Sequence, residues 1–310
     1  MRLRSDVLAK RKKKIKPMRL LFIITFTIFP TLHFLLFYVL VNIQSFISAF
    51  QLTTLGELHW TVENFQWFFM AVFGGELSLQ FRNTFITFVL QQIMFVISFF
   101  TSYFLYKKIP LHSFFRTVFF LPTVIAATVT MGIYQRIVGP YGPIALIVQN
   151  ILNLDYKPEL LADSRFANFF VLLPIVWLGI AGNMVLFGGT FSRIPDSLVE
   201  SAKLDGVNWL RELFQIIIPI VWPTVSVLMV INLAGVFGAN GQVFLPTRGQ
   251  NGTDTLANWM YMQVFTADGA FQHNTYNRLS MVGIVLTTIS VALALGLRKF
   301  TDKFFGEVEY

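Results

Sequence analysis

The sequence of 310 residues contains no cysteine and little charge. Without cysteine, the chain has no disulfide framework, no thiol nucleophile and no cysteine for lipid attachment. Asp, Glu, Lys and Arg make up 13% of the residues, which is about half of what a soluble protein carries. The apolar share is 55%, and 35 residues are Phe. These proportions predict a polytopic membrane protein.

Motifs for catalysis and metal binding are also missing. No G-x-x-x-x-G-K-[ST] phosphate-binding loop occurs, so the chain is not expected to hydrolyse ATP. No two histidines have metal-ligand spacing, and no nucleophile, base and orienting group can be grouped. We therefore expect no catalytic residue, no metal site and no cofactor bound by this chain.

Several apolar runs reach about 20 residues, the length that crosses a hydrocarbon core of about 30 Å. The sequence predicts an all-α membrane protein with six transmembrane helices, at residues 20–41, 79–106, 112–137, 168–190, 215–237 and 279–297. Pro122 lies inside the third run. The connecting loops are predicted at 42–77, 139–167 and 238–277, with the first of them partly at the membrane interface, where Trp is favoured.

Charge predicts the orientation of these helices. Residues 1–19 hold nine Lys or Arg and are interpreted as a retained cytoplasmic tail. A signal peptide is the alternative, but the next apolar run is long for one and lacks a small-residue cleavage site. A nucleic-acid-binding arm is less favoured than a contact with the membrane surface. With the N-terminus inside, inner segments hold 18 Lys or Arg and outer segments six, so both termini are predicted to be cytoplasmic.

The polar segment between the fourth and fifth runs is the most distinctive part of the sequence. A helix can start at Asp196 or Ser197, directly after a proline. The pair Asp205-Gly206 indicates a turn, and Asn208 can cap a second short helix that runs to about Phe214. The segment is thus predicted to be a compact knob of two helices that projects from the membrane.

This segment resembles the EAA motif of ABC importer membrane subunits. The residues that fit the motif are Glu200, Ala202, Asp205, Gly206, Ile216 and Pro219. Ser201, Val207 and Ile218 replace its usual residues with small or apolar ones. The preceding segment I-P-D-S-L (Ile194–Leu198) resembles the I-P-x-x-L sequence that precedes the motif in the sugar-importing permeases, the maltose and glycerol-phosphate type. Weaker similarities at Arg82–Thr84, Phe120–Pro122, Ile133–Ile144, Asn183–Phe187 and Gln242–Gly249 extend the resemblance over about residues 60–300.

The resemblance implies a type I, MetI-like permease. It would comprise a basic cytoplasmic tail (1–19), a first helix with an outer loop (20–78), a five-helix core (79–297) with a cytoplasmic coupling loop (191–214), and a C-terminal cytoplasmic tail (298–310). The implied partners are a second homologous permease, two ATP-binding cassette ATPase subunits that carry ATP and Mg, and an extracytoplasmic solute-binding protein. A homodimer of permeases is the less favoured alternative.

By this resemblance, the coupling loop seats in a cleft of an ATPase subunit. Glu200 would bond a basic residue there, and Ser201 belongs to the same short motif. Ala202 would allow a close approach, Gly206 would allow the bend, and Asp205 would cap or pair locally.

Polar residues within membrane spans usually face a bundle interior or a cavity. The candidates for a substrate pathway are Trp177, Gly179, Asn183, Asn232, Asn240 and Gln242. Amides and an aromatic face suit sugars, which are neutral and rich in hydroxyl groups. The alternative is that the Asn and Gly residues hold helices together.

These patterns predict a permease for a mono- or oligosaccharide in a bacterial plasma membrane. An ABC permease for glycerol phosphate, phosphate, a peptide or an amino acid is an alternative. A secondary transporter would show inverted repeats with broken helices and intramembrane carboxylates, which the sequence does not indicate. A membrane scaffold or sensor would not explain the motif segment.

Overall fold

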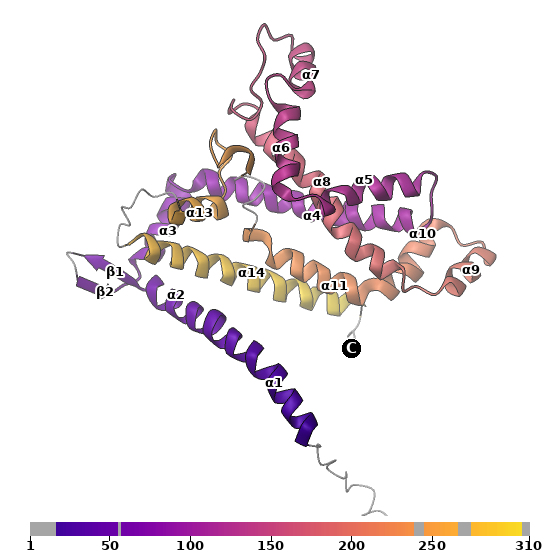
Figure 1. Ribbon diagram of the computed structural model, residues 1–310, viewed down its shortest axis with the longest axis horizontal. Coiled ribbons are helices and arrows are strands. Elements are labelled where there is room, and N and C mark those ends of the chain that lie inside the picture. Colours follow the sequence, from indigo (N-terminus) through magenta and orange to yellow (C-terminus); the bar gives the residue numbers. More distant parts are fainter. Residues whose placement is uncertain (1–16, 55–56, 239–244, 266–273, 306–310) are drawn as a thin grey trace, which may run out of the picture.

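The computed structural model describes residues 17–54, 57–238, 245–265 and 274–305, and most of them are helical (Figure 1). The elements are α1 (Pro17–Phe34), η1 (Leu35–Leu40), α2 (Val41–Ala49), β1 (Gln51–Thr54), β2 (Glu57–Trp60), α3 (Glu63–Gly74), α4 (Ser78–Tyr106), α5 (His112–Val124), α6 (Ala127–Val138), α7 (Pro143–Ile151), α8 (Ala167–Phe191), α9 (Asp196–Leu204), α10 (Trp209–Arg211), η2 (Glu212–Ile217), α11 (Ile218–Ala234), η3 (Val236–Gly238), α13 (Leu256–Phe265) and α14 (Thr275–Phe305).

Helices long enough to cross a membrane dominate the described part of the chain. Five pass on length and apolar composition: Leu21–Ala49, Ser78–Tyr106, Ala167–Phe191, Trp209–Ala234 and Thr275–Thr301. A bent pair, His112–Val124 with Ala127–Ile151, makes a sixth if it counts as one span. The predicted class, an all-α membrane protein, is confirmed.

The predicted third span is not one straight helix. Its two halves, α5 and α6, meet at a bend of 111°. Ile125 has extended backbone angles, and Ala126 has a ψ of 135°, so neither continues the helix. Pro122 contributes no N–H to the last turn of α5, which weakens the helix just before the bend.

Other predicted boundaries were also wrong. The first helix continues through the π-helical turn η1 to Ala49, eight residues beyond the predicted end. The predicted loop 42–77 holds the rest of that helix, the antiparallel hairpin β1–β2 with Gln51 opposite Trp60, and α3. The loops at 139–167 and 238–277 contain α7 and α13, which are too short to cross a membrane. Short elements give a weak periodic signal in sequence, which is why they were missed.

The best-packed part of the molecule is the α4–α8 pair. Phe95 and Phe99 of α4 meet Phe187 of α8 edge to face, with ring centroids 5.1 and 5.4 Å apart. Gly179 of α8 lies so close to α4 that an added Cβ would stand 3.2 Å from the Cβ of Met94. The small residue thus allows the two backbones to approach, as in other membrane helix pairs. This pair forms a closely packed centre of the described part of the chain.

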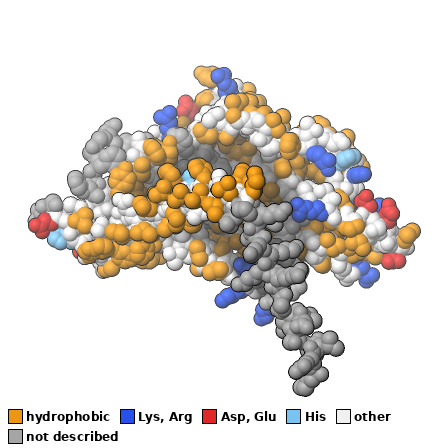
Figure 2. Space-filling view, turned by 60° about the horizontal axis from the view of Figure 1, so that its bottom comes forward, with side chains coloured by type: hydrophobic (Ala, Val, Ile, Leu, Met, Phe, Trp, Pro, Cys, Tyr) orange, Lys and Arg blue, Asp and Glu red, His pale blue; other side chains and the backbone are white. Residues whose placement is uncertain are grey.

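The outside of the bundle is apolar. Figure 2 shows apolar side chains over the broad middle of one face, with charged side chains mainly toward its ends. The first long helix, Leu21–Ala49, has no buried residue in its most apolar 18-residue window. An apolar helix surface is stable in contact with hydrocarbon or with another chain. The surface of this helix is therefore expected to contact lipid or a partner chain rather than the interior of this chain.

The motif segment lies at one end of the bundle. In Figure 1, α9 and α10 stand where α4 and α8 finish and where α5 and α11 begin. The hairpin β1–β2, α3 and α13 lie at the opposite end. The motif segment and these elements are therefore separated by the length of the long helices.

Candidate functional site: the motif segment at the bundle end

The first helix of the motif segment begins at Asp196, as predicted. Its N-cap is Pro195, which forms no side-chain capping bond. At the other end, Gly206 has a φ of +68°, a conformation that costs other residues more. The N–H of Gly206 donates to the Lys203 carbonyl (3.1 Å), and the N–H of Val207 donates to the Ala202 carbonyl (3.0 Å). These two bonds form a Schellman motif, so Gly206 fixes the turn through its backbone angle.

The helix α9 has one face toward its own chain and one toward solvent. Val199 and Ala202 are buried, with 9% and 4% of their surface exposed. Glu200 is exposed, and Leu204 is 89% exposed. Leu198 is 43% exposed. The outward face therefore combines a carboxylate with large apolar side chains.

The five predicted coupling residues fall on different sides of this knob. Glu200, Ser201 and Asp205 are exposed, and the Ser201 hydroxyl donates to the carbonyl of Ser197 at 2.8 Å. Ala202 is instead buried within this chain. The role of these residues toward a partner remains a prediction.

The second helix, α10, has the predicted cap but not the predicted end. The Asn208 side chain accepts a hydrogen bond from the backbone N–H of Arg211 at 2.9 Å. Instead of stopping near Phe214, the helix continues through the π-helical turn η2 into α11, as one 26-residue helix from Trp209 to Ala234. Pro219 lies just after the junction of η2 and α11, inside this continuous helix, and donates no backbone N–H to it. The motif segment is therefore continuous with a membrane span.

A buried ion pair fastens this segment to α4. The Lys107 ammonium lies 2.7 and 2.8 Å from the two carboxylate oxygens of Glu212, and the two side chains are 20% and 4% exposed. The Tyr103 hydroxyl donates to the Trp209 carbonyl at 3.4 Å, and the Phe104 and Trp209 rings lie 5.7 Å apart. Breaking a buried pair by removing one partner costs about 3–5 kcal/mol.

Sequence reasoning did not single out Lys107 or Glu212. A signal for the pair existed, because Lys107 directly follows the second apolar run and Glu212 stands beside the apolar residues that open the fifth. Their pairing depends on how the end of α4 and the start of η2 lie in space, which the sequence pattern does not give.

The predicted pathway residues do not form one group. Gly179 packs on α4, and the Asn183 amide donates to the Gly179 carbonyl of its own helix at 3.0 Å. Asn232 of α11 accepts a hydrogen bond from Gln92 of α4 at 3.0 Å. Trp177 is 38% exposed on α8. Asn240 and Gln242 lie outside the described residues.

These contacts match the helix-packing alternative for Gly179 and Asn232. A hydrogen bond between two membrane helices satisfies both amides and holds the helices in register. A contribution of any of the six residues to a pathway remains a prediction.

Known proteins resemble the chain in sequence and in fold. The probable ABC transporter permease protein YurN of Bacillus subtilis is 30% identical over 190 residues, which are 60% of this chain and 63% of that protein. The arabinooligosaccharides transport system permease protein AraP of the same organism is 23% identical over 89% of this chain and 87% of that protein. The matched region therefore spans less than two thirds of YurN but most of AraP. No protein-family model matches the sequence.

Two solved structures of a bacterial alginate ABC transporter share the fold. One, described as involved in the import of that acidic polysaccharide, matches with a TM-score of 0.70 at 15% identity, over 91% of this chain and 96% of the other. The other, in complex with an alginate-bound periplasmic protein, gives 0.71 at 16% identity, over 93% and 96%.

The chain therefore shares its fold with a chain of these bacterial ABC transporter structures. Similarity in sequence extends to transport permeases of sugar systems, so the resemblance predicted from the motif segment is confirmed. The long apolar helices and the bacterial relatives together indicate a protein of a bacterial membrane.

Proposed function

We propose that this chain is the permease subunit of an ATP-driven importer that moves a sugar across a bacterial plasma membrane. A binding protein outside the membrane delivers the sugar, and separate subunits bind ATP and Mg and hydrolyse the ATP. This chain binds no cofactor and performs no catalysis. It changes conformation when its partner subunits do.

The observation that carries this proposal is the fastened knob at the bundle end. The outward face of α9 offers Glu200 and Leu204 to a partner, while Val199 and Ala202 hold the inward face against the bundle. The ion pair of Lys107 with Glu212 then ties the segment to α4. A force applied to α9 is passed to α4 and to α11, so motion of an ATPase would turn these helices together as in rigid-body domain motions.

The proposed orientation places α9, α10 and both termini in the cytoplasm. Two features support it: Lys and Arg are concentrated in the segments assigned to that side, and ATP is available there. The elements at the opposite end, among them β1, β2, α3 and α13, then face outward and meet the binding protein. A second, homologous permease completes the pathway.

A sugar is the favoured substrate because of the relatives and of the chemistry of the spans. AraP is named for arabinooligosaccharides, and the structural relatives transport alginate. The spanning helices contain uncharged amides such as Asn183 and Gln92, which hydrogen-bond hydroxyl groups without attracting an ion. Transport assays with a panel of sugars would identify the particular sugar.

The first test is composition and coupling. The chain is tagged, expressed with its neighbouring genes, and purified in mild detergent. Co-purification with ATPase subunits and a second permease, and ATP hydrolysis stimulated by a loaded binding protein, are expected. A stable oligomer of this chain alone, without any ATPase, would contradict the proposal and favour a secondary transporter.

The absence of cysteine allows a sharper test of the contact face. A single Glu200→Cys variant should form a cross-link to a cysteine in the ATPase cleft, because Glu200 is exposed. The matched control, Ala202→Cys, lies two residues away but is buried, and should not. Equal cross-linking at both positions would show that α9 does not seat as proposed.

A further inference from the structure

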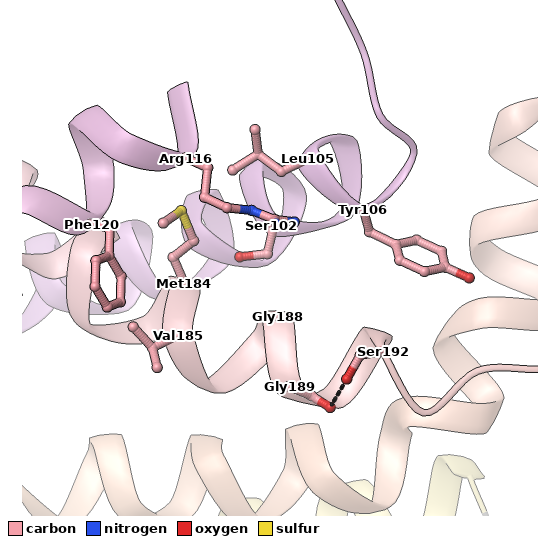
Figure 3. Close-up of a pocket in the computed structure, with 10 residues that line it drawn as sticks. All are labelled: Ser102, Leu105, Tyr106, Arg116, Phe120, Met184, Val185, Gly188, Gly189 and Ser192. Carbon is pink, nitrogen blue, oxygen red and sulfur yellow. Dashed lines mark hydrogen bonds between the residues drawn. The ribbon is translucent and has the colours of Figure 1, made fainter. Parts of the chain in front are cut away.

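A cavity of about 390 Å³ lies beside the motif segment, between α4, α5 and α8 (Figure 3). Its lining residues are Ser102, Leu105, Tyr106, Arg116, Phe120, Met184, Val185, Gly188, Gly189 and Ser192. Arg116 is the charged residue of this set, and none of the ten is acidic. A cavity of this size is within the range of small-molecule sites.

Arg116 is a cation without a counter-ion within the described residues, where it has no hydrogen bond or ion pair. It occupies the second turn of α5, next to Phe115 and near Phe114, which are 38% and 61% exposed. Such apolar neighbours would meet lipid, and Arg116 is itself exposed at this end of the bundle, so its charge is accessible to an anionic headgroup. In Figure 3 its side chain extends from α5 toward Ser102 of α4.

The wall of the cavity also holds a hydroxyl that lacks a partner. The Oγ of Ser102 is buried, Ser102 is 3% exposed, and this oxygen has no hydrogen-bond partner among the described residues. A buried hydroxyl without a partner costs free energy, so its presence beside the cavity points to a ligand that accepts or donates there. Ser192, in contrast, already donates to the Gly189 carbonyl at 2.9 Å.

An open wall completes the site. A Cβ added to Gly188 or Gly189 would meet nothing within 4 Å, so these glycines leave room instead of filling a packed contact. The C-terminal ends of α4 and α8 lie at this cavity and carry partial negative charge. Binding of an anion must therefore depend on the full charge of Arg116.

We propose that this cavity binds the phosphate group of an anionic phospholipid, with Arg116 as the ion-pairing group and Ser102 as a hydrogen-bond donor. The guanidinium forms paired hydrogen bonds with phosphate oxygens, and the exposed Phe side chains beside it contact the acyl chains. The cavity opens at the end of the bundle that holds α9, so the lipid belongs to the cytoplasmic leaflet in the proposed orientation. The proposed lipid contact does not depend on the identity of the transported solute.

The test uses the complete purified transporter complex and native mass spectrometry. Detergent-purified complex is titrated with phosphatidylglycerol, and the same titration is made with uncharged phosphatidylcholine at equal chain length. The wild type should bind phosphatidylglycerol more tightly. Arg116→Ala should weaken the tightest-bound phosphatidylglycerol about tenfold, the loss of one charge-assisted contact, and Ser102→Ala should weaken it less. Lys299→Ala, an exposed lysine near the end of α14 that does not line the cavity, should change nothing.

Two results would overturn the proposal. If Arg116→Ala and the wild type bind phosphatidylglycerol equally, the cavity is not the lipid site. If inorganic phosphate at millimolar concentration displaces the lipid from the wild type, the site takes a soluble phosphate and not a headgroup. The complex of each variant is first shown to assemble with the same thermal unfolding midpoint in phosphatidylcholine, so that a folding defect is not read as a binding defect.

Discussion

The helix α4 is fastened at both ends, but by different chemistry. At its first turns, the Asn83 amide donates to the carbonyls of Gly252 and Asp254, each at 2.8 Å, and the hydroxyl of Thr84 accepts from the N–H of Leu256 at 2.9 Å. At its last turn, the buried Lys107–Glu212 pair holds the motif segment. The two ends of α4 therefore differ in the kind of contact that joins them to the rest of the chain.

Neutral hydrogen bonds and an ion pair respond differently to loss of a partner. An unpaired buried carbonyl costs about 1–3 kcal/mol, whereas an unpaired buried charge costs about 3–5 kcal/mol. The neutral end therefore suits a static clasp. The charged end resists separation more strongly, as the proposed coupling to an ATPase would require.

The largest effect is expected from Glu212→Ala. It leaves the partly buried Lys107 ammonium without its partner, so the free energy of unfolding should fall by about 3 kcal/mol, the lower end of the range for a buried pair. Thermal unfolding of the purified complex measures the change. The double variant Lys107→Met with Glu212→Leu removes both charges and should recover most of the stability. A double variant as unstable as the single one would show that the pair is not the fastening.

Asn83→Ala tests the opposite end. Two carbonyls lose their donor, and the free energy of unfolding should fall by about 2 kcal/mol. The neighbouring Arg82→Ala is the matched control, because Arg82 is exposed on the same turn of α4. ATP hydrolysis stimulated by the binding protein should be affected less than by Glu212→Ala. Equal loss of stimulated ATP hydrolysis in Asn83→Ala and Glu212→Ala would show that the two ends of α4 do not differ in coupling.

Gly206 tests the turn that orients α9. Because its φ is +68° and open space surrounds its Cβ position, Gly206→Ala should cost about 1 kcal/mol through backbone strain alone. Gly206→Asn should cost less, since Asn tolerates this region. Gly206→Glu places a bulky acid on the knob and should abolish stimulated ATP hydrolysis while the subunit stays in the membrane. Normal stimulation in that variant would exclude the coupling role.

The smallest effect is a pH dependence at the neutral end. Burial raises the pKa of Asp254 above the ordinary aspartate value of 3.8, although its hydrogen bonds from Asn258, Gln80 and Thr255 oppose this. The folded state then binds more protons than the unfolded state, so stability falls as the pH rises from about 4 through the folded pKa. Asp254→Asn should flatten this slope in thermal unfolding measured from pH 4 to 7. If the slope of stability against pH is unchanged in Asp254→Asn, other titratable groups cause the pH dependence.

Much of the architecture could be predicted from the sequence, because apolar length is a strong signal. The predicted spans at residues 79–106, 168–190, 215–237 and 279–297 each overlap a long helix. The broken third span escaped prediction, since the apolar composition of 112–137 is the same in a straight and in a bent helix. The extension of the first helix to Ala49 escaped for the related reason that Asn42 and Gln44 were interpreted as loop residues.

The motif segment was predictable in its local form but not in its attachment. The start at Asp196, the turn at Gly206 and the cap at Asn208 all depend on neighbouring residues, so sequence sufficed. The Lys107–Glu212 pair, by contrast, joins residues that are 105 positions apart in the chain. A single sequence does not show which distant residues are in contact.

The central claim is that the motif segment and α4 move as one unit because Lys107 and Glu212 join them. Charge reversal measures this most directly, with ATP hydrolysis stimulated by the loaded binding protein as the readout. Lys107→Glu alone and Glu212→Lys alone should each lose stimulation, because each places two like charges together. The double reversal should regain most of it. If the double reversal stays uncoupled while the complex is assembled and stable, or if the single reversals remain coupled, the ion pair is not the joint between the two.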